Sequence, residues 1–413
     1  MASRTYGILW RWHFLAGLVA CPVIFVLAVT GALYVFQPEL ERFAYSELRE
    51  VTPRGEPMPI DALVASIPPE CRHGSIEVPT RPTFAVRVWC PGDGKQSAFI
   101  DPYSGALLGR EIWDDTIFGF ILKVHWELLL GENGRLVVEW ATSWTIVMLL
   151  TGAYLWWPSR RGGGKWWPRR NVASRQRLRD LHSVAGAYVL PLLFVISATG
   201  LFWTRFAGED RWHRVANDPA DQVWDAPPKS SAPAGRPRIG FDRAILAAGI
   251  DMRDEWRGVS IDIGKDPTAA YTVYASSLDN DTPWHTEIIF IDAYDGTDLR
   301  RVGWSERSTL NQISNAGYAI HVGAIGSWPG RILALVAAIV LAALCVTGPW
   351  LWWKRRPRGK LGIPPRAERF AWPLVTGLIV LGWLMPTVGY TLLAIAAFEL
   401  GHFGARRVLA RMS

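Results

Sequence analysis

The sequence His125-x8-Gly134-Arg135, followed by Thr151-Gly-Ala-Tyr-Leu-Trp-Trp157, occurs a second time as His321-x8-Gly330-Arg331, followed by Thr347-Gly-Pro-Trp-Leu-Trp-Trp353. The spacings are the same in both copies. Upstream of each copy lies another repeated pair, in which His13 precedes Thr30-Gly31 by seventeen residues, as His182 precedes Thr199-Gly200. Matching motifs in the same order indicate an internal duplication, so each half is expected to supply one copy of the same fold.

Long apolar segments are typical of a membrane protein. Half of the 413 residues are hydrophobic, and tryptophans cluster at the ends of the apolar runs, as expected for side chains at headgroup depth. About 20 helical residues are needed to span the hydrocarbon core. Four segments are long enough: Ile8 to Phe36, Leu136 to Trp157, Leu181 to Trp203 and Ile332 to Trp353. We therefore expect a membrane α-helical bundle of four main helices.

The distribution of basic residues predicts the orientation of this bundle. The net charge is +7, and arginines and lysines concentrate in loops 158–180 and 354–370, which follow the second and fourth spans. By the positive-inside rule, these loops and the N-terminus are cytoplasmic. The charge then reflects topology, and no nucleic-acid partner is expected. The first apolar run is too long for a signal peptide, so segment 1–36 is expected to remain as a helix.

Segments 37–116 and 204–308 are then external, and each has the pattern of a small α+β domain. Each is expected to begin with a short helix, from Pro59 to Ser66 and, after a Pro-rich linker, near Phe241 to Gly249. Alternating runs then predict six strands, at 75–78, 84–88 and 97–100 and near 259–263, 270–274 and 287–291. Each domain ends in a repeated turn, Phe99-Ile-Asp-Pro-Tyr-Ser-Gly105 or Phe290-Ile-Asp-Ala-Tyr-Asp-Gly296. Cys71 and Cys90 both lie in the first domain, where an oxidising compartment favours a disulfide.

Segments 117–157 and 309–353 each begin with a short helix at the outer membrane surface. The expected helices run from Ile117 to Leu130 and from Thr309 to Ile325, and glycine-rich breaks at 131–134 and 326–330 separate them from the spans. A last apolar segment, 371–413, is interrupted by Pro386 and Gly389. It is either one kinked span or a hairpin, and its basic end favours the hairpin.

Four histidines occupy repeat-matched positions at the membrane interfaces, His13 and His182 inside and His125 and His321 outside. Parallel repeats related by an axis along the membrane normal place equivalent residues opposite one another. Two neutral imidazoles facing each other are the axial ligands of a six-coordinate haem. The alternative is that each histidine only bonds a neighbour or a headgroup, but four matched, costly intramembrane polar groups favour ligation. We predict two non-covalent, b-type haems, because no Cys-x-x-Cys-His occurs.

Other repeated residues have two interpretations. The Thr-Gly pairs suit either helix packing or close approach of a macrocycle. Arg135 and Arg331, and on the inner side Arg11 and Arg179, are candidates for pairing with haem propionates, or anchors for lipid headgroups. Cys21 and Cys345 are expected to be packing residues. His73, His213 and His285 lie on external segments and are expected to be solvated. His402 has no repeat counterpart and is a weaker candidate for haem ligation.

Taken together, His-x8-Gly-Arg, Thr-Gly-x-x-Leu-Trp-Trp, Leu181-His182 leading to Thr199-Gly200, and Asp-x-Tyr-x-Gly resemble the PepSY-associated transmembrane proteins from about residue 8 to residue 356. That family includes ferric-siderophore reductases of the Gram-negative inner membrane, which bind haem through membrane histidines. The resemblance implies periplasmic PepSY-like domains, the ligands His13, His125, His182 and His321, and reduction of siderophore iron. The electron donor is left open between a quinol, a flavoprotein and a soluble reductant.

Two other functions compete with a reductase. Paired PepSY-type domains can bind or inhibit a partner with the membrane part as an anchor, but this leaves the matched histidines unexplained. A transporter is disfavoured because the spans contain almost no ionisable residue besides the histidines. Candidates for docking a siderophore complex are Trp113, Trp284 and Trp304, each of which is also suited to packing within its own domain.

Overall fold

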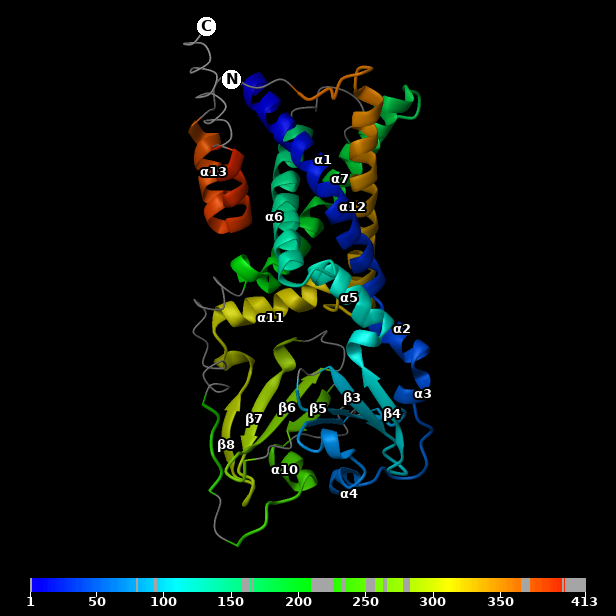
Figure 1. The fold of residues 1–413 in the computed structure, drawn as a ribbon, viewed down its shortest axis with the longest axis vertical. Coiled ribbons are helices and arrows are strands. Elements are labelled where there is room, and N and C mark those ends of the chain that lie inside the picture. The colour runs from blue at the N-terminus through cyan, green and yellow to red at the C-terminus, as the bar shows by residue number, and fades with distance from the viewer. Residues whose placement is uncertain are drawn as a thin grey trace. The chain divides into compact units, whose positions relative to one another are not determined.

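The computed structural model describes residues 2–78, 81–92, 95–157, 164, 166–208, 226–231, 235–249, 257–262, 266–277, 283–364, 372–395 and 397. The chain forms two compact units. We call residues 1–32, 123–215 and 333–413 the bundle unit, and residues 33–122 and 216–332 the sheet unit. Figure 1 shows the elements of each unit, and the chain passes between the units four times.

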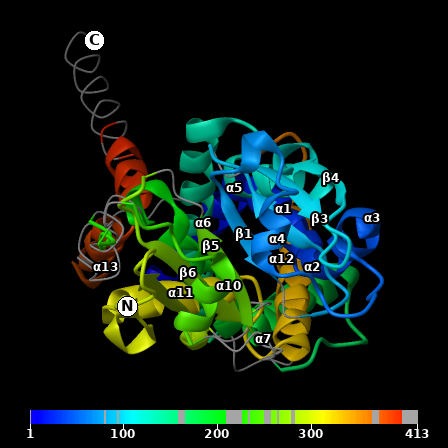
Figure 2. The same ribbon diagram turned by 90° about the horizontal axis from the view of Figure 1, so that it is seen from below.

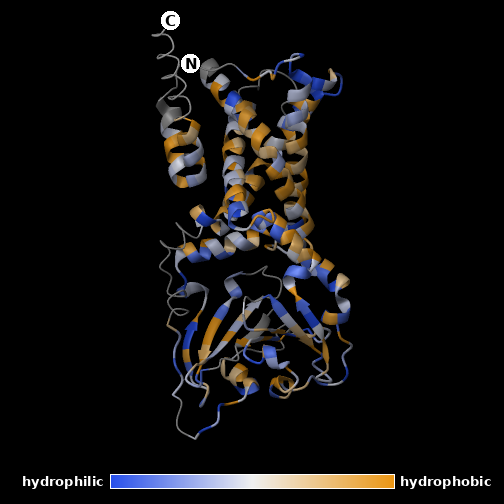
Figure 3. Cartoon of the chain, in the orientation of Figure 1, coloured by the Kyte–Doolittle hydropathy of each residue, from blue (hydrophilic) through white to orange (hydrophobic). Residues whose placement is uncertain are grey.

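Four helices of the described chain are long and apolar enough to cross a membrane. They are α1 (Ala2–Tyr34), α6 (Gly131–Trp156), α7 (Ser174–Gly200) and α12 (Trp328–Arg355). Hydrophobic residues predominate along all four (Figure 3). The four predicted spans are confirmed, although α7 begins at Ser174, within the segment that the charge pattern assigned to the loop 158–180.

Small side chains allow the helices of the bundle unit to approach closely. Ala20, Ala141 and Ser143 are completely buried, and the indole rings of Trp12 and Trp144 stack with centroids 6.1 Å apart. Without a hydrophobic effect between lipid-facing helices, such close packing is what holds membrane helices together. Cys21 and Cys345 contribute to this core as packing residues, as expected.

The C-terminal segment turns back on itself within its described part. Helix α13 (Trp372–Leu384) ends before Met385, and a second apolar helix runs from Pro386 to Ile395. A Cβ placed on Gly382 would lie 3.0 Å from Cα of Gly389, a proximity that a straight helix excludes for residues seven apart. The second helix packs on α6, where the indole N–H of Trp140 donates to Oγ1 of Thr391 at 3.0 Å. This geometry agrees with the hairpin.

The sheet unit contains one antiparallel sheet of eight strands with the order β4-β3-β2-β1-β5-β6-β7-β8. The first half contains β1 (Ser75–Val78), β2 (Val86–Trp89), β3 (Gln96–Ile100) and β4 (Leu107–Ile112). The second half contains β5 (Arg257–Asp262), β6 (Tyr271–Ser277), β7 (Glu287–Ile291) and β8 (Asp298–Val302). Strand β1 pairs with β5, with Ile76 opposite Ile261, so both α+β halves share one sheet (Figure 2).

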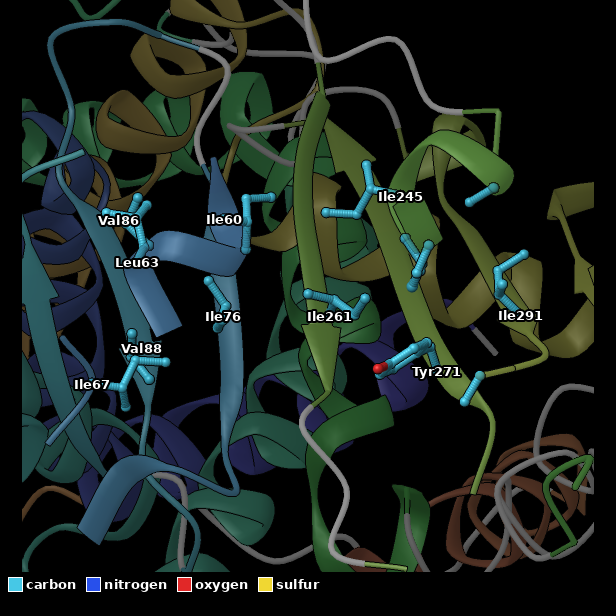
Figure 4. Packing of buried hydrophobic residues seen from close by; sticks show 14 of the residues in the cluster. Ile60, Leu63, Ile67, Ile76, Val86, Val88, Ile245, Ile261, Tyr271 and Ile291 are labelled. Atoms are coloured by element: carbon cyan, nitrogen blue, oxygen red, sulfur yellow. The ribbon is translucent and has the colours of Figure 1, made fainter. Parts of the chain in front are cut away.

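Helices α4 (Ile60–Val64) and α10 (Phe241–Ala247) close the core of the sheet unit. Figure 4 shows buried side chains along this core, from Leu63 beside Val86 in the first half to Ile261 and Tyr271 in the second. The two helices cap each other, because Asp61 accepts a hydrogen bond from the backbone of Phe241 at 2.6 Å and Asp242 accepts one from Ile60 at 2.9 Å. These reciprocal caps satisfy N–H groups that the first helical turn leaves without partners.

The repeated Asp-x-Tyr-x-Gly sequence forms a turn in both halves. Asp101 and Asp292 each accept the backbone N–H two residues later, from Tyr103 and Tyr294, at 2.8 Å. The prediction that these turns end the domains is wrong, because strands β4 and β8 follow them. Both are edge strands with mostly exposed side chains, and they therefore lack the apolar alternation by which a strand is recognised. The predicted Cys71–Cys90 disulfide is confirmed.

Shorter helices lie in the sheet unit, and one of them, α5, continues into the bundle unit. The predicted surface helices correspond to α5 (Ile117–Glu127) and α11 (Thr309–His321), whereas α2 (Gln37–Ala44) and α3 (Ser46–Arg49) were not foreseen. Single 3-10 turns lie at Pro69–Cys71, Trp113–Asp115, Leu201–Trp203, Pro283–His285 and Trp304–Glu306.

The glycine of each His-x8-Gly-Arg motif is explained by a close contact. A Cβ on Gly134 would lie 1.6 Å from the carbonyl oxygen of Glu127, and a Cβ on Gly330 would lie 2.0 Å from that of Ile325. Gly134 is inside α6, because that helix begins at Gly131. The break therefore lies before residues 131–134, at Leu128 and Leu129, which have positive φ angles.

Candidate functional site

His13 of α1 is held by a threonine and a glycine of α6. Its Nδ1 atom lies 3.0 Å from Oγ1 of Thr151. The neighbouring Gly152 leaves room for the imidazole, because a Cβ there would lie 3.1 Å from Cε1 of His13. The Thr-Gly pair of one helix therefore orients the histidine of another.

The second half contains the same arrangement. Nδ1 of His182, on α7, lies 2.8 Å from Oγ1 of Thr347, on α12, and a Cβ on Gly348 would lie 3.5 Å from Cε1 of His182. His13 and His182 are also close enough to interact electrostatically. The structure thus brings the two inner histidines of the prediction into one region of the bundle unit.

His125, in the last turn of α5, makes a third such contact. Its Nδ1 atom lies 2.9 Å from Oγ1 of Thr30, and a Cβ on Gly31 would lie 3.3 Å from its Cε1 atom. His321 is the last residue of α11 and belongs to the sheet unit. The pairing of His125 with His321 stays a prediction.

The threonine hydroxyls determine which imidazole nitrogen carries hydrogen. Thr151 donates its single hydroxyl proton to the carbonyl of Val147 at 2.8 Å, Thr347 to that of Ala343 at 2.8 Å and Thr30 to that of Val26 at 2.7 Å. Each Oγ1 can then only accept from the histidine, so Nδ1 is protonated in the neutral ring. We assign this tautomer from the hydrogen-bond network. The lone pair of each imidazole is then on Nε2.

Thr199, the threonine of the fourth Thr-Gly pair, also donates its hydroxyl proton to a backbone carbonyl. It donates to the carbonyl of Val195 at 2.8 Å. Its oxygen is therefore also restricted to accepting.

Partial exposure of His13, His125 and His182 shows that protein atoms do not enclose these side chains completely.

The candidate arginines contact protein groups. Arg135 lies 4.7 Å from the ring centroid of Trp126 and 3.1 Å from Glu132, and the buried Arg331 forms an ion pair with Glu39. On the inner side, Arg11 donates to the carbonyl of Pro364 and Arg179 lies 3.3 Å from Asp180. A role in propionate binding stays a prediction for all four.

The remaining candidates differ in their exposure. His73 and His285 are exposed, as expected, and His213 and His402 fall outside the described residues. Trp284 is exposed, whereas Trp113 and Trp304 are half-buried at the starts of 3-10 turns.

Sequence reasoning missed two functional or structural roles. It did not assign the threonines to the histidines, although the shared spacing of the repeats was a signal for such a pairing. It also described the spans as almost free of ionisable groups, yet Glu139 of α6 is completely buried. Glu139 accepts the backbone N–H of Phe206 at 2.8 Å, which stabilises the chain after α7. Among the described residues, no three His, Cys, Asp or Glu side chains group around a common metal position.

Comparison with known proteins identifies a family. No curated protein matches the chain. A family model described as the PepSY-associated TM region matches residues 10–355. This range includes most of α1, the other three long helices, both halves of the sheet and every histidine of the repeated motifs. The chain therefore belongs to the family defined by the PepSY-associated TM region.

Proposed function

We propose that this membrane protein is a haem-dependent ferric-siderophore reductase of the bacterial inner membrane. The observation that carries the proposal is the bond from Nδ1 to a threonine hydroxyl at His13, His125 and His182, which leaves Nε2 as the ligating nitrogen. Metal-bound histidines characteristically donate their other ring N–H to a fixed acceptor, which sets both tautomer and ring orientation.

The residues fit a b-type haem in their chemistry. A haem held by two imidazoles would supply a one-electron couple and would leave no open position for oxygen. His13 and His182 would hold one haem, and His125 and His321 the other. Gly31, Gly152 and Gly348 each keep one ring in position by leaving space for its Cε1 edge.

The overall reaction adds one electron to ferric iron and breaks no covalent bond of the siderophore. Siderophore oxygens bind ferrous iron far less tightly, so reduction releases it. We assign electron entry to the side of His13 and His182, from a quinol, a flavoprotein or a soluble reductant, and exit to the side of His125 and His321. Arg135 and Arg331 would bind propionates on that side.

Charge and cysteine chemistry support the orientation. The basic segments follow the ends of α6 and α12, which the positive-inside rule assigns to the cytoplasm together with the N-terminus. The Cys71–Cys90 disulfide lies in the sheet unit, and such bonds persist in oxidising compartments such as the periplasm. Both observations support the proposal that the sheet unit is periplasmic.

The test is a visible spectrum of the full-length protein in detergent. We expect a Soret band, sharp reduced α and β bands, and two haems per chain. Addition of a ferric siderophore to the reduced protein should oxidise the haem, so that the reduced bands disappear. One ferrous ion should form for each haem oxidised. A variant that lacks both inner ligands, His13→Ala with His182→Ala, is the control. Reduced bands that persist beside the siderophore would exclude its iron as acceptor, and protein without chromophore from haem-replete cells would favour an anchored binding protein.

A further inference from the structure

A cavity of about 390 Å³ in the sheet unit combines clustered arginines with aromatic walls. Among the described residues, its lining includes five arginines and two glutamates: Arg42, Arg49, Arg81, Arg87, Arg331, Glu41 and Glu77. This volume is within the range of small-molecule sites. The arginines come from α2, α3, β2, α12 and the connection before β2, so the fold gathers them from segments far apart in the sequence.

Two phenylalanines order the guanidinium groups. Arg42 and Arg81 lie 5.5 and 5.6 Å from the ring centroid of Phe84, and Arg49 and Arg87 lie 5.3 and 5.5 Å from that of Phe99. Stacking on an aromatic face restrains a guanidinium while its N–H edge stays able to donate. The cavity therefore presents oriented donors for planar, anionic oxygen groups.

Carboxylates pair with most of these arginines and leave a small excess of positive charge. Arg331 forms an ion pair with Glu39, and Arg42 lies 4.0 Å from the same carboxylate. Arg49 binds Glu111 at 2.8 Å and Glu41 at 3.2 Å, and Arg87 lies 3.3 Å from the same Glu111. Burial lowers the pKa of Arg87, and the charge of Arg49 lowers it further. Within the described residues, the buried Nε atom of Arg49 has no hydrogen-bond partner. An incoming anion would relieve the repulsion and satisfy this donor.

The duplication shows that the fold does not require these charges. Phe99 pairs with Arg87 across the sheet, and the repeat-equivalent Phe290 pairs with Thr272. Likewise, Glu111 opposite Ser97 corresponds to Val302 opposite Ile288. In the second half Ile288, Phe290 and Val302 form a closed hydrophobic cluster. The same position is thus an apolar core in one half and a charged cavity in the other.

We propose that this cavity binds the substrate complex, and that it selects iron chelates with net negative charge, whose metal is held by catecholate or carboxylate oxygens, over chelates with net positive charge. The inference rests on the proposed function and specifies its substrate class. The cavity accommodates one arm of such a chelate, whose oxygens accept hydrogen bonds from the guanidinium groups.

Gallium(III) chelates test binding separately from electron transfer, because gallium takes the place of ferric iron and is not reduced. Binding to the full-length protein in detergent is followed by tryptophan fluorescence for a net negative tris-catecholate and for a net positive trihydroxamate. We expect the negative chelate to bind at least tenfold more tightly, with an affinity that falls as salt is added. Equal affinities would overturn the proposal.

Three variants locate the site. Arg81→Gln removes a half-buried cavity arginine, and Arg87→Thr introduces the residue that the second half carries at the equivalent position. Each substitution should lower the affinity for the negative chelate by about tenfold, the effect of losing one charge-assisted hydrogen bond. Arg300→Gln removes an exposed arginine of β8, outside the cavity, and should leave binding unchanged. Wild-type binding in both cavity variants would refute the site.

The outcomes separate this inference from the proposed function. If the gallium chelate binds through the cavity arginines and the ferric chelate is not reduced, the cavity assignment stands and the reductase fails. If ferric chelates are reduced equally well by wild type, Arg81→Gln and Arg87→Thr, the reductase stands and the cavity assignment fails.

Discussion

Nδ1 of His182 lies 2.8 Å from Oγ1 of Thr347, whose own proton is already donated to the carbonyl of Ala343. This relationship makes the threonine an obligatory acceptor, and it fixes the orientation in which the imidazole presents Nε2. The same relationship at His13 and His125 indicates that a neighbouring helix sets the orientation of each imidazole.

Loss of the threonine acceptor should therefore weaken haem binding. For Thr151→Val we expect haem affinity to fall about 10- to 100-fold, the usual cost of removing a partner of a metal-bound histidine. Thr151→Ser keeps the hydroxyl and should behave as wild type. The measurement is haem retained per chain after dilution in detergent, together with the midpoint potential.

Thr145→Val is the matched control for that experiment. Thr145 is a buried threonine of the same helix that donates to the carbonyl of Ala141 at 2.8 Å, the same local bond as in Thr151. Equal haem loss in Thr145→Val and Thr151→Val would indicate a general effect on helix packing and would contradict the assigned role.

The glycines should respond unequally to alanine. In Gly152→Ala the new Cβ would lie 3.1 Å from Cε1 of His13, which forces the ring to move, whereas in Gly348→Ala the distance to His182 is 3.5 Å, an ordinary contact. We expect Gly152→Ala to shift the low-spin electron paramagnetic resonance signal of one haem and to reduce its occupancy severalfold. Gly348→Ala should retain the wild-type signal, and the opposite order would contradict this account.

The histidine pairs predict which variants lose the same cofactor. His13→Ala and His182→Ala should each lose one haem, with the remaining haem at the same midpoint potential in both. His125→Ala and His321→Ala should lose the other one. Redox titration of the four purified variants checks this, and a partner pair that retains different haems would refute the pairing.

Asp292 should make the sheet unit sensitive to acid. Burial alone would raise the pKa of its carboxyl, but backbone N–H groups of Ser231, Tyr294 and Asp295 outweigh that effect and lower the pKa from its ordinary value of 3.8. A lowered pKa in the folded state contributes stability above pH 3.8, and this contribution is lost as the pH falls through the lowered value.

Asp292→Asn should cost about 2 kcal/mol of unfolding free energy at neutral pH, the scale of hydrogen bonds to a charged group. It should also flatten the dependence of Tm on pH in the acid range. Asp101→Asn, at the equivalent and more exposed turn, should cost less. Identical acid profiles for wild type and Asp292→Asn would exclude this role.

The sequence predicted the elements that have strong periodicity or length. The four spans, the disulfide and six of the eight strands follow from local patterns. The edge strands β4 and β8 do not, because their exposed side chains are not constrained by a core. Helices α2 and α3 are short and polar, and their place is determined by contacts such as that of Arg49 with Glu111, 62 residues away.

The site was predictable as a set of residues but not as a set of contacts. Repeat spacing identified the histidines, whereas the bond from His13 to Thr151 joins residues 138 apart and depends on which helices are neighbours. The arginine cavity left no local signal. Arg87 and Glu111 have the sequence pattern of solvated strand positions, and only the sheet register brings them together.

The antiparallel pairing of β1 with β5 has a consequence for the origin of the protein. A polypeptide with only one half would expose β1 as an unpaired edge, which invites association with another chain. Two copies of that polypeptide could form the missing backbone hydrogen bonds with each other through the same strand pairing, in a closed twofold homodimer. Gene fusion of such an ancestor would allow the two copies to differ in sequence, so that one half could carry Arg87 where the other carries Thr272.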